Sequence, residues 1–203
     1  GKKYDATFYL GKLIDVNDKL KEFNFQFKTI EQSFQIEFND LKTYTAEDYN
    51  YYKSSGTIYT ADYIEADKIE KILSAKFNNK LTKIKWIHDE KLITHKFYID
   101  SVARGTLLNS NLNYNWNCDY IKLKNSGEKE FLVPAKGKFT LLNVQVINSP
   151  EQFVQIALSN PINKDQTLEG LVNLAEFKDL KIVTDNNFIK LYPNEIKTGT
   201  FKL

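Results

Sequence analysis

The sequence is poor in sulfur, with one cysteine, Cys118, and no methionine among its 203 residues. A single thiol excludes an intrachain disulfide, so every folded domain must be stabilised by its core alone. A lone thiol suits the cytosol, and it equally suits a large envelope lipoprotein that needs no disulfide. A chain that begins Gly1-Lys2-Lys3 and has no Met predicts a piece of a longer protein. The lack of a signal sequence is therefore uninformative.

Glycine, long apolar runs and excess charge of one sign are also lacking. The 8 glycines never cluster, which excludes a glycine-rich phosphate-binding loop. No apolar run approaches the roughly 18 residues of a membrane helix. Lys and Arg total 28 against 26 acidic residues, a net charge of +2, so charge gives no reason to expect nucleic acid or an anionic membrane as partner. Lys alternates with apolar residues from Lys83 to Trp86 as in some single-strand binders, but any amphipathic strand shows this alternation.

Aromatic residues are what the chain has in abundance. Its 12 Tyr, 14 Phe and 2 Trp favour half-buried strands over helices, and 42% hydrophobic residues are enough to form real cores. At 203 residues, two β-sandwiches of about a hundred residues each fit the usual domain size. The composition predicts a mostly β fold of tandem antiparallel, Ig-like β-sandwich domains.

The first part of the chain, residues 1–30, predicts a long hairpin. Residues 4–10 and 23–30 are apolar segments on either side of a polar stretch, 15–22, which is expected to be a turn or a short helical turn. Phe alternates with polar residues from Phe23 to Phe27, which is the period of a strand with one buried face. Because an isolated two-stranded hairpin is marginal in water, it is expected to close a truncated preceding domain or to form an N-terminal extension packed on something else.

Residues 31–135 predict a complete sandwich with the one helix of the chain. Apolar residues at 69, 72 and 73 recur at helical spacing, and Asp62 with Glu65 resembles a capping box, so a helix is expected over 64–76. The other expected features are a strand at 34–38, a turn at Asn78-Asn79, a hairpin over 81–100, one or two strands within 106–124, and a turn at 125–128.

Residues 136–203 predict most of a second sandwich. Pro134 to Gly137 is the best linker in the sequence. The linker precedes apolar runs at 154–158, 180–183 and 188–192, which are separated by the turn sequences at 159–161, 185–187 and 193–194. Pro161 and Pro193 are expected at strand ends, where a missing N–H is tolerated. Gly170 and Gly199 are expected at turns or bulges.

The sequence offers weak candidates for chemistry. His88 and His95, with Asp89 and Glu90, suggest a metal site, but no other His and no Cys lies nearby, so exposed polar turn residues are the favoured interpretation. No spacing indicates a Ser-His-Asp or Cys-His arrangement, so no catalytic, cofactor-binding or metal-binding residue is predicted. An exposed aromatic platform for sugar is the better alternative, and its candidate residues are Tyr49, Tyr51, Tyr52 and Trp116.

The order of several short motifs resembles the N-terminal macroglobulin-like domains of bacterial, Bacteroidota-type alpha-2-macroglobulins. The strongest part is the C-terminal stretch: Ser159-Asn160-Pro161, Gln166, Leu168, Gly170-Leu171-Val172, residues 187–193 (NFIKLYP) and Thr198-Gly199-Thr200. Weaker similarity extends through residues 4–13, Phe23 to Phe27, Gly56-Thr57, Ile69-Glu70-Lys71, Trp86 to His88, Asp100 to Arg104 and Val133-Pro134-Ala135. The thioester of that family needs a Gln three residues after its Cys, but Ile121 stands there, so Cys118 is expected to be a buried or neutral thiol.

This resemblance implies a non-catalytic structural arm of an endopeptidase inhibitor that traps proteases at the cell envelope. The expected partners are the other domains of the parent chain and, through the parent, host or bacterial proteases, with no cofactor, no nucleic acid and no membrane contact by this fragment. The implied location is the periplasm or outer-membrane surface, with anchoring through parts outside the chain. A surface adhesion or glycan-binding β-sandwich lipoprotein is the alternative from another class, and an enzyme comes third.

Overall fold

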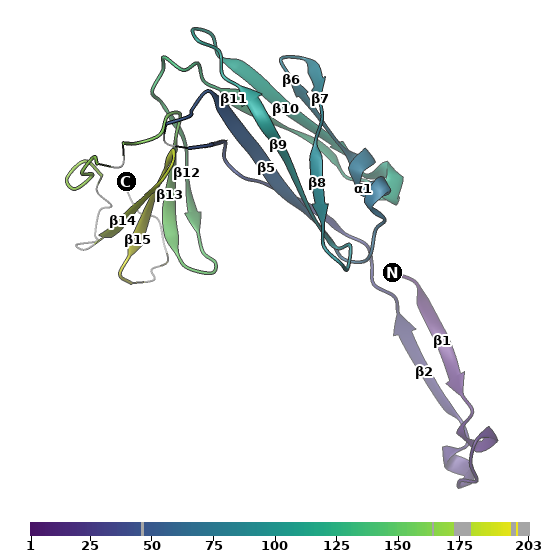
Figure 1. The fold of residues 1–203 in the computed structure, drawn as a ribbon. Helices are drawn as coiled ribbons and strands as arrows, with labels where there is room; N and C mark the ends of the chain where they lie inside the picture. The colour runs from purple at the N-terminus through teal and green to yellow at the C-terminus, as the bar shows by residue number, and fades with distance from the viewer. Residues whose placement is uncertain (46, 164, 173–179, 196–197, 199–203) are drawn as a thin grey trace.

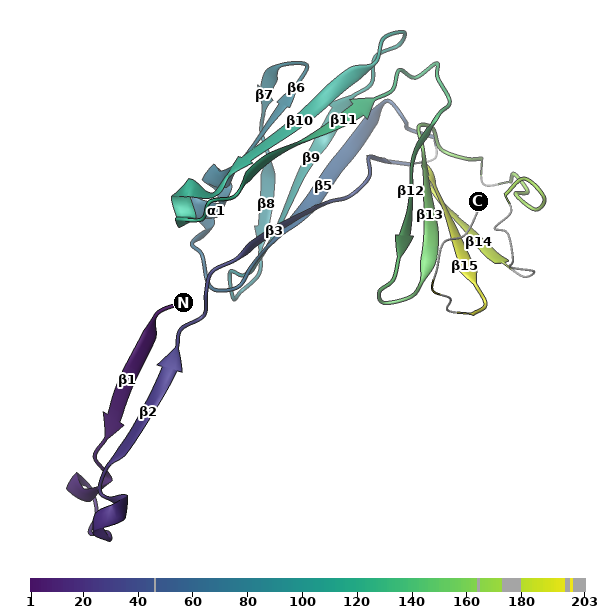
Figure 2. The same ribbon diagram turned by 180° about the vertical axis from the view of Figure 1, so that it is seen from behind.

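The computed structural model describes residues 1–45, 47–163, 165–172, 180–195 and 198. The chain is mostly β, with antiparallel sheets and a single α-helix in its described part, as the composition predicts. Figures 1 and 2 show three parts in succession: an N-terminal hairpin, a central module and a C-terminal module. None of the helices that the structure describes is long and apolar enough to cross a membrane.

The N-terminal hairpin pairs β1 (Lys3–Phe8) with β2 (Phe23–Lys28) in antiparallel register, as expected. The connection contains two short 3₁₀ turns, η1 (Leu10–Lys12) and η2 (Asp18–Leu20). These two strands form a sheet of their own. In both views the hairpin projects away from the rest of the molecule (Figures 1 and 2).

The central module is a sandwich of two antiparallel sheets. The first sheet has the order β3-β5-β9-β8 with β4 paired to β5, and the second has the order β11-β10-β6-β7. The strands of the first sheet are β3 (Phe34–Phe38), β4 (Lys42–Thr43), β5 (Tyr51–Thr60), β8 (Lys85–His88) and β9 (Thr94–Ala103). Those of the second are β6 (Leu73–Phe77), β7 (Lys80–Thr82), β10 (Ser110–Asn117) and β11 (Ser126–Val133). One aromatic and aliphatic core lies between them, with Tyr52, Phe97 and Tyr114 fully buried.

The helix α1 (Ala66–Ile72) is shorter than the expected 64–76. From Leu73 the burial alternates with period two, and residues 73–77 pair with β10 as strand β6 instead of continuing the helix. The predicted capping box does not form, because Glu65 is the N-cap residue and its side chain makes no capping hydrogen bond. Asp62 accepts a hydrogen bond from the backbone of Tyr63.

Two further predictions for this module need correction. The expected hairpin over 81–100 is confirmed only in its second part, where β8 pairs with β9; β7 instead pairs with β6 in the other sheet. The expected turn at 125–128 is mostly strand, since β11 begins at Ser126; the chain turns earlier, through η3 (Cys118–Ile121) and the left-handed Lys122. The turn at Asn78-Asn79 is confirmed, and both residues have positive φ.

The C-terminal module contains one four-stranded antiparallel sheet in its described part, with the order β12-β13-β15-β14. The strands are β12 (Leu141–Ile147), β13 (Phe153–Leu158), β14 (Leu180–Asp185) and β15 (Phe188–Pro193). Ile156, Ile189 and Leu191 are buried on one face of the sheet beneath Ile162 and Leu168, which come from the segment after β13. Pro193 ends β15 and Gly170 has a positive φ of 77°, as expected for their positions, whereas Gly199 lies outside the described residues.

Candidate functional site

The most elaborate polar site in the molecule is the joint between the central and C-terminal modules. It begins with the turn between β14 and β15, where Asn186 adopts a left-handed conformation with a φ of 57°. That turn places the fully buried Asn187 against strand β4. The Asn187 Oδ1 accepts hydrogen bonds from the backbone N of Thr43 at 2.9 Å and from its hydroxyl at 3.3 Å. Its Nδ2 donates to Leu41 O at 2.9 Å and to Leu158 O at 2.8 Å.

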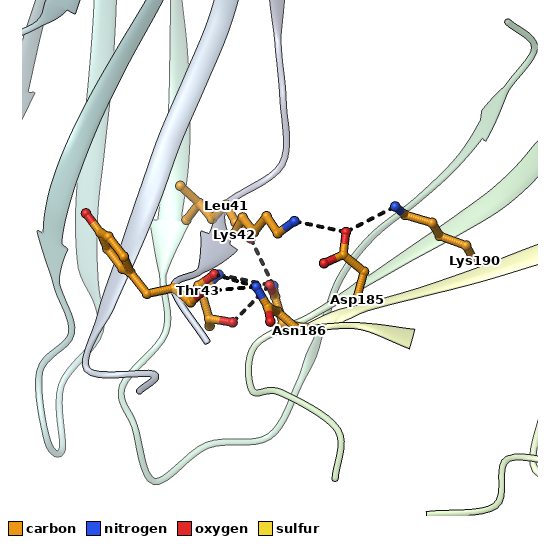
Figure 3. Close-up of polar contacts among 8 residues, drawn as sticks. Leu41, Lys42, Thr43, Asp185, Asn186 and Lys190 are labelled. Carbon is orange, nitrogen blue, oxygen red and sulfur yellow. Dashed lines mark hydrogen bonds and ion pairs between the residues drawn. The ribbon is translucent and has the colours of Figure 1, made fainter. Parts of the chain in front are cut away.

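The neighbours of Asn187 extend this contact toward the solvent (Figure 3). Asn186 donates through Nδ2 to the carbonyls of Thr43 and Tyr44. Asp185 lies between Lys42 of the central module, at 2.9 Å, and Lys190 of β15, at 3.1 Å. Partial burial opposes ionisation of Asp185, but the two lysines outweigh it and lower the pKa of its carboxyl.

A second contact is made by Arg104, which follows β9 and is 5% exposed. Its Nε donates to Pro134 O at 3.0 Å, and its Nη2 donates both to Ala135 O at 3.2 Å and to the Asn160 Oδ1 at 2.8 Å. The guanidinium also lies 4.8 Å from the ring centre of Tyr52. One side chain thus holds the linker, the central module and the start of the loop after β13, which the planar, multiply donating guanidinium is suited to do.

Tyr52 links the same regions from the β5 side. Its hydroxyl, fully buried, donates to Ser159 O at 2.5 Å. Burial raises the pKa of Tyr52 to about 12, although the nearby Arg104 opposes this, so the hydroxyl stays protonated and a donor at neutral pH.

Asp40 completes the joint at its partly exposed rim. It accepts hydrogen bonds from Asn143 at 2.9 Å, Gln145 at 3.0 Å and Gln155 at 3.3 Å, all on β12 and β13. Taken together, the joint aligns the C-terminal sheet with the central module by many directed hydrogen bonds. Its donors and acceptors satisfy one another, and directed bonds between the two modules hold them in a fixed orientation.

No family model, curated protein or solved structure matches the chain. The interpretation of the site therefore depends on its geometry alone.

The histidine pair lies elsewhere, on β8 and β9 of the central module. The prediction of two exposed turn residues is wrong. His95 is fully buried because it faces the sandwich interior from a paired strand, and His88 is the last residue of β8 with a side chain that is 17% exposed. The Nδ1 atoms of His88 and His95 lie 2.8 Å apart, and His88 Nε2 lies 3.3 Å from Glu70 of α1. Asp89 instead binds the backbone N–H groups of residues 93 and 94. In the described part of the chain, no three His, Cys, Asp or Glu side chains come close enough to hold a metal ion.

The expected aromatic platform does not form as one surface. Tyr52 is buried in the joint, and Trp116, on the other sheet, packs on the core next to Phe38. Tyr49 and Tyr51 remain exposed. Cys118 is buried as expected, and burial together with the nearby Asp119 raises the pKa of its thiol to about 11.

Sequence reasoning missed the residues that make the joint. Arg104 enters the sequence analysis only within a motif of the family resemblance, and Asn187 enters there and in the expected turn at 185–187; no spacing marks either residue as buried. The sequence contains one signal for Asn187, which follows a turn residue and directly precedes the apolar strand sequence FIKLY. A polar side chain next to a buried strand needs hydrogen-bond partners, and these can come from across an interface.

Proposed function

We propose that this chain is a non-catalytic structural arm of a larger bacterial protein, of the alpha-2-macroglobulin type that inhibits endopeptidases at the cell envelope. The observation that carries the structural part is the joint. Its buried donors and acceptors, above all Asn187 and Arg104, come from both modules and the linker. A flexible connection between independent domains would need none of them, since inter-domain motion is the default where the interface is small and unspecific.

The resemblance described above supports the more specific part of the proposal, the inhibitor. An inhibitor that encloses its target needs modules that keep their relative orientation while a distant segment is cleaved. Semi-rigid β modules joined by short linkers that are held by hydrogen bonds meet that need without any chemistry of their own.

The fixed orientation of the central and C-terminal modules, which we call the frame, is tested by distance measurements on the chain itself. Spin labels on Lys96→Cys and Lys181→Cys, both exposed positions, report the separation of the two modules. A narrow distance distribution is expected in the otherwise native chain and a broad one after Arg104→Ala. The buried Cys118 should not react with the label. A broad distribution in the native chain would contradict the frame.

The inhibitor is tested on the full-length protein that contains this chain. It should block an endopeptidase from cutting a large protein substrate while leaving cleavage of a short peptide, and the present chain alone should do neither. Unchanged cleavage of the large substrate in the presence of the full-length protein, across endopeptidases of different classes, would reject the inhibitor but leave the frame standing.

One observation favours glycan binding as the second candidate. A surface hollow of about 320 Å³ lies beside the start of α1, with the exposed rings of Tyr63 and Tyr120 and the polar groups of Gln32, Lys68 and Lys122 at its wall. Aromatic faces beside polar donors are the chemistry that binds sugars. Saturable binding on a glycan array that is lost with Tyr63→Ala and Tyr120→Ala would favour this candidate over the frame.

A further inference from the structure

Two histidine rings meet at one end of the first sheet, where His88 ends β8 and His95 lies opposite it on β9. Their Nδ1 atoms are 2.8 Å apart, so one of them donates a hydrogen and the other accepts it. The second nitrogen of His88, Nε2, lies 3.3 Å from a carboxylate oxygen of Glu70 on α1. The second nitrogen of His95 is buried and has no hydrogen-bond partner among the residues that the structure describes. We call Glu70, His88 and His95 the histidine cluster.

These partners assign the hydrogens of the neutral cluster. A carboxylate only accepts hydrogen bonds, so Nε2 of His88 carries the hydrogen and Nδ1 of this neutral ring is a bare acceptor. His95 must then donate through Nδ1, which leaves its buried Nε2 without a hydrogen. A buried N–H group without an acceptor is costly, and this arrangement of hydrogens avoids one.

A proton that enters the cluster disturbs this arrangement. If His88 takes the proton, its Nδ1 becomes a donor, so His95 must accept there and carry its own hydrogen on Nε2. If His95 takes the proton, Nε2 receives it directly. In both cases an intact pair places an N–H at the buried Nε2 of His95, for which the described part of the chain offers no acceptor. The pair therefore cannot take up a proton and remain fully hydrogen-bonded.

The surroundings of His88 favour a positive charge on its ring. The carboxylate of Glu70 lies beside Nε2, and the ring of Trp86 stacks on His88 with the centroids 5.8 Å apart. The side chain of His88 is also 17% exposed, whereas His95 is fully buried. The proton therefore enters the cluster at His88.

The surroundings of His95 resist a positive charge. Burial and then His88 lower the pKa of His95, and they outweigh the carboxylate of Asp89 and the carbonyl of Leu92, which act in the other direction. Hydrogen bonds from the backbone, first of all from Thr94, lower the pKa of Asp89 itself, so Asp89 stays ionised in mild acid. The charge on Asp89 is thus constant where an imidazole titrates.

We propose that the histidine cluster is an acid-sensitive clasp, which holds the end of β8 on β9 at neutral pH and releases it in mild acid. On release the protonated ring of His88 moves into solvent, and water reaches Nδ1 of His95. No buried N–H then lacks an acceptor. β8 is the outer strand of its sheet and His88 is its last residue, so the movement breaks few other contacts. The inference is independent of the proposed inhibitor.

The assignment of hydrogens is tested first, by nitrogen NMR of the imidazole rings in the native chain. The chain has only these two histidines, so its ring signals are few. At about pH 7.5 the nitrogen that carries the hydrogen should be Nε2 in His88 and Nδ1 in His95. A hydrogen on Nε2 of His95 at this pH overturns the proposal.

Release is measured by hydrogen exchange at the amide of Asp89, which donates to Thr94 O across the end of the β8–β9 pair. One proton taken up one unit below the ordinary imidazole pKa of about 6.5 shifts an equilibrium at most about tenfold. The protection factor of this amide should therefore fall about five- to tenfold between about pH 7.5 and 5.5. Exchange in acid should be unaffected by low urea, because a local opening exposes little surface. Unchanged protection, or exchange that accelerates with urea as in global unfolding, overturns the proposal.

The variant His88→Gln assigns the effect to the cluster. Its side-chain carbonyl can accept the hydrogen of His95 Nδ1, but it does not titrate, so the protection of Asp89 should differ less than about twofold between the two pH values. Lys91→Gln, an exposed exchange in the same turn, is the matched control and should keep the five- to tenfold fall. A fall in His88→Gln as large as in the native chain overturns the proposal. The two measurements on the native chain test it without any variant.

Discussion

Replacing Asn187 should loosen the joint more than any other single exchange of similar size. Asn187→Ala removes the acceptor of the buried Thr43 N–H and the donor to the carbonyls of Leu41 and Leu158. A buried polar group left without its partner costs about 1–3 kcal/mol. Asn187→Ala leaves two or three such groups unpaired, and water that enters the space satisfies them in part. The free energy of unfolding should therefore fall by roughly 3–5 kcal/mol, a large share of the 5–15 kcal/mol that stabilises a typical domain.

The variant Asn187→Asp separates hydrogen bonding from packing. Its shape is nearly that of Asn, so a residue that only fills space should tolerate it. However, Asp carries an acceptor where Asn187 donates, and that oxygen would face two carbonyl oxygens at 2.8–2.9 Å. We therefore expect Asn187→Asp to destabilise at least as much as Asn187→Ala. Asn186→Asp next to it is the matched control, because Asn186 lies at the partly exposed side of the turn, and it should cost less.

The chain supplies its own reporters for this assay. Both tryptophans, Trp86 and Trp116, lie in the central module, so their fluorescence follows that module alone, whereas circular dichroism follows strands in both modules. In urea the two signals should change together for the native chain. For Asn187→Ala the dichroism should begin to change at lower urea than the fluorescence, because the C-terminal module loses its support first. Coincident transitions at the native midpoint in both Asn187 variants would refute the reasoning.

Three further predictions concern the central module. Gly56→Ala should destabilise it by about 1–3 kcal/mol, because a Cβ there would clash with Glu37 O and with the buried ring of Phe97. Gly137→Ala should change the urea midpoint little, because its Cβ would meet only Thr106 O, at an ordinary contact distance of 3.7 Å. Burial, and then the neighbouring His88, lower the pKa of His95 below its ordinary 6.5, so the folded state disfavours the protonated ring. The unfolding free energy should therefore be greatest above about pH 6.5 and fall as the pH drops below it, and His95→Gln should flatten this dependence; an equal slope in the variant would contradict the assignment. Cys118, with a thiol pKa of about 11, should react with a thiol reagent at pH 8 only after unfolding, and rapid labelling of the native chain would show that it is accessible.

Much of the fold follows from local pattern. Phe34, Ile36 and Phe38 alternate with polar residues, and they form β3 with the expected faces. The C-terminal end of the predicted helix is wrong because Leu73 and Ala75 fit a helical stripe and an alternating strand equally well. Pairing with β10 favours the strand. Local pattern does not predict this strand pairing, because the pairing depends on residues about forty positions away.

The joint could not be predicted for a related reason. Arg104 and Asn187 are polar residues whose burial depends on partners from other modules, and a sequence pattern assigns polar residues to the surface by default. His95 failed in the same way, since an imidazole beside a turn sequence was expected to be exposed. By contrast, the buried state of Cys118 was predicted correctly, because a neutral thiol behaves as a small apolar side chain.

Most of the bonds that Arg104 and Asn187 make end on main-chain atoms: the carbonyls of Pro134, Ala135, Tyr49, Leu41 and Leu158, and the amide of Thr43. Every residue type presents a carbonyl, and all but proline present an amide. The positions opposite these two side chains are therefore free to change identity as long as the backbone path is kept. Only a few side chains carry the geometry of the joint, so it can persist through extensive sequence drift.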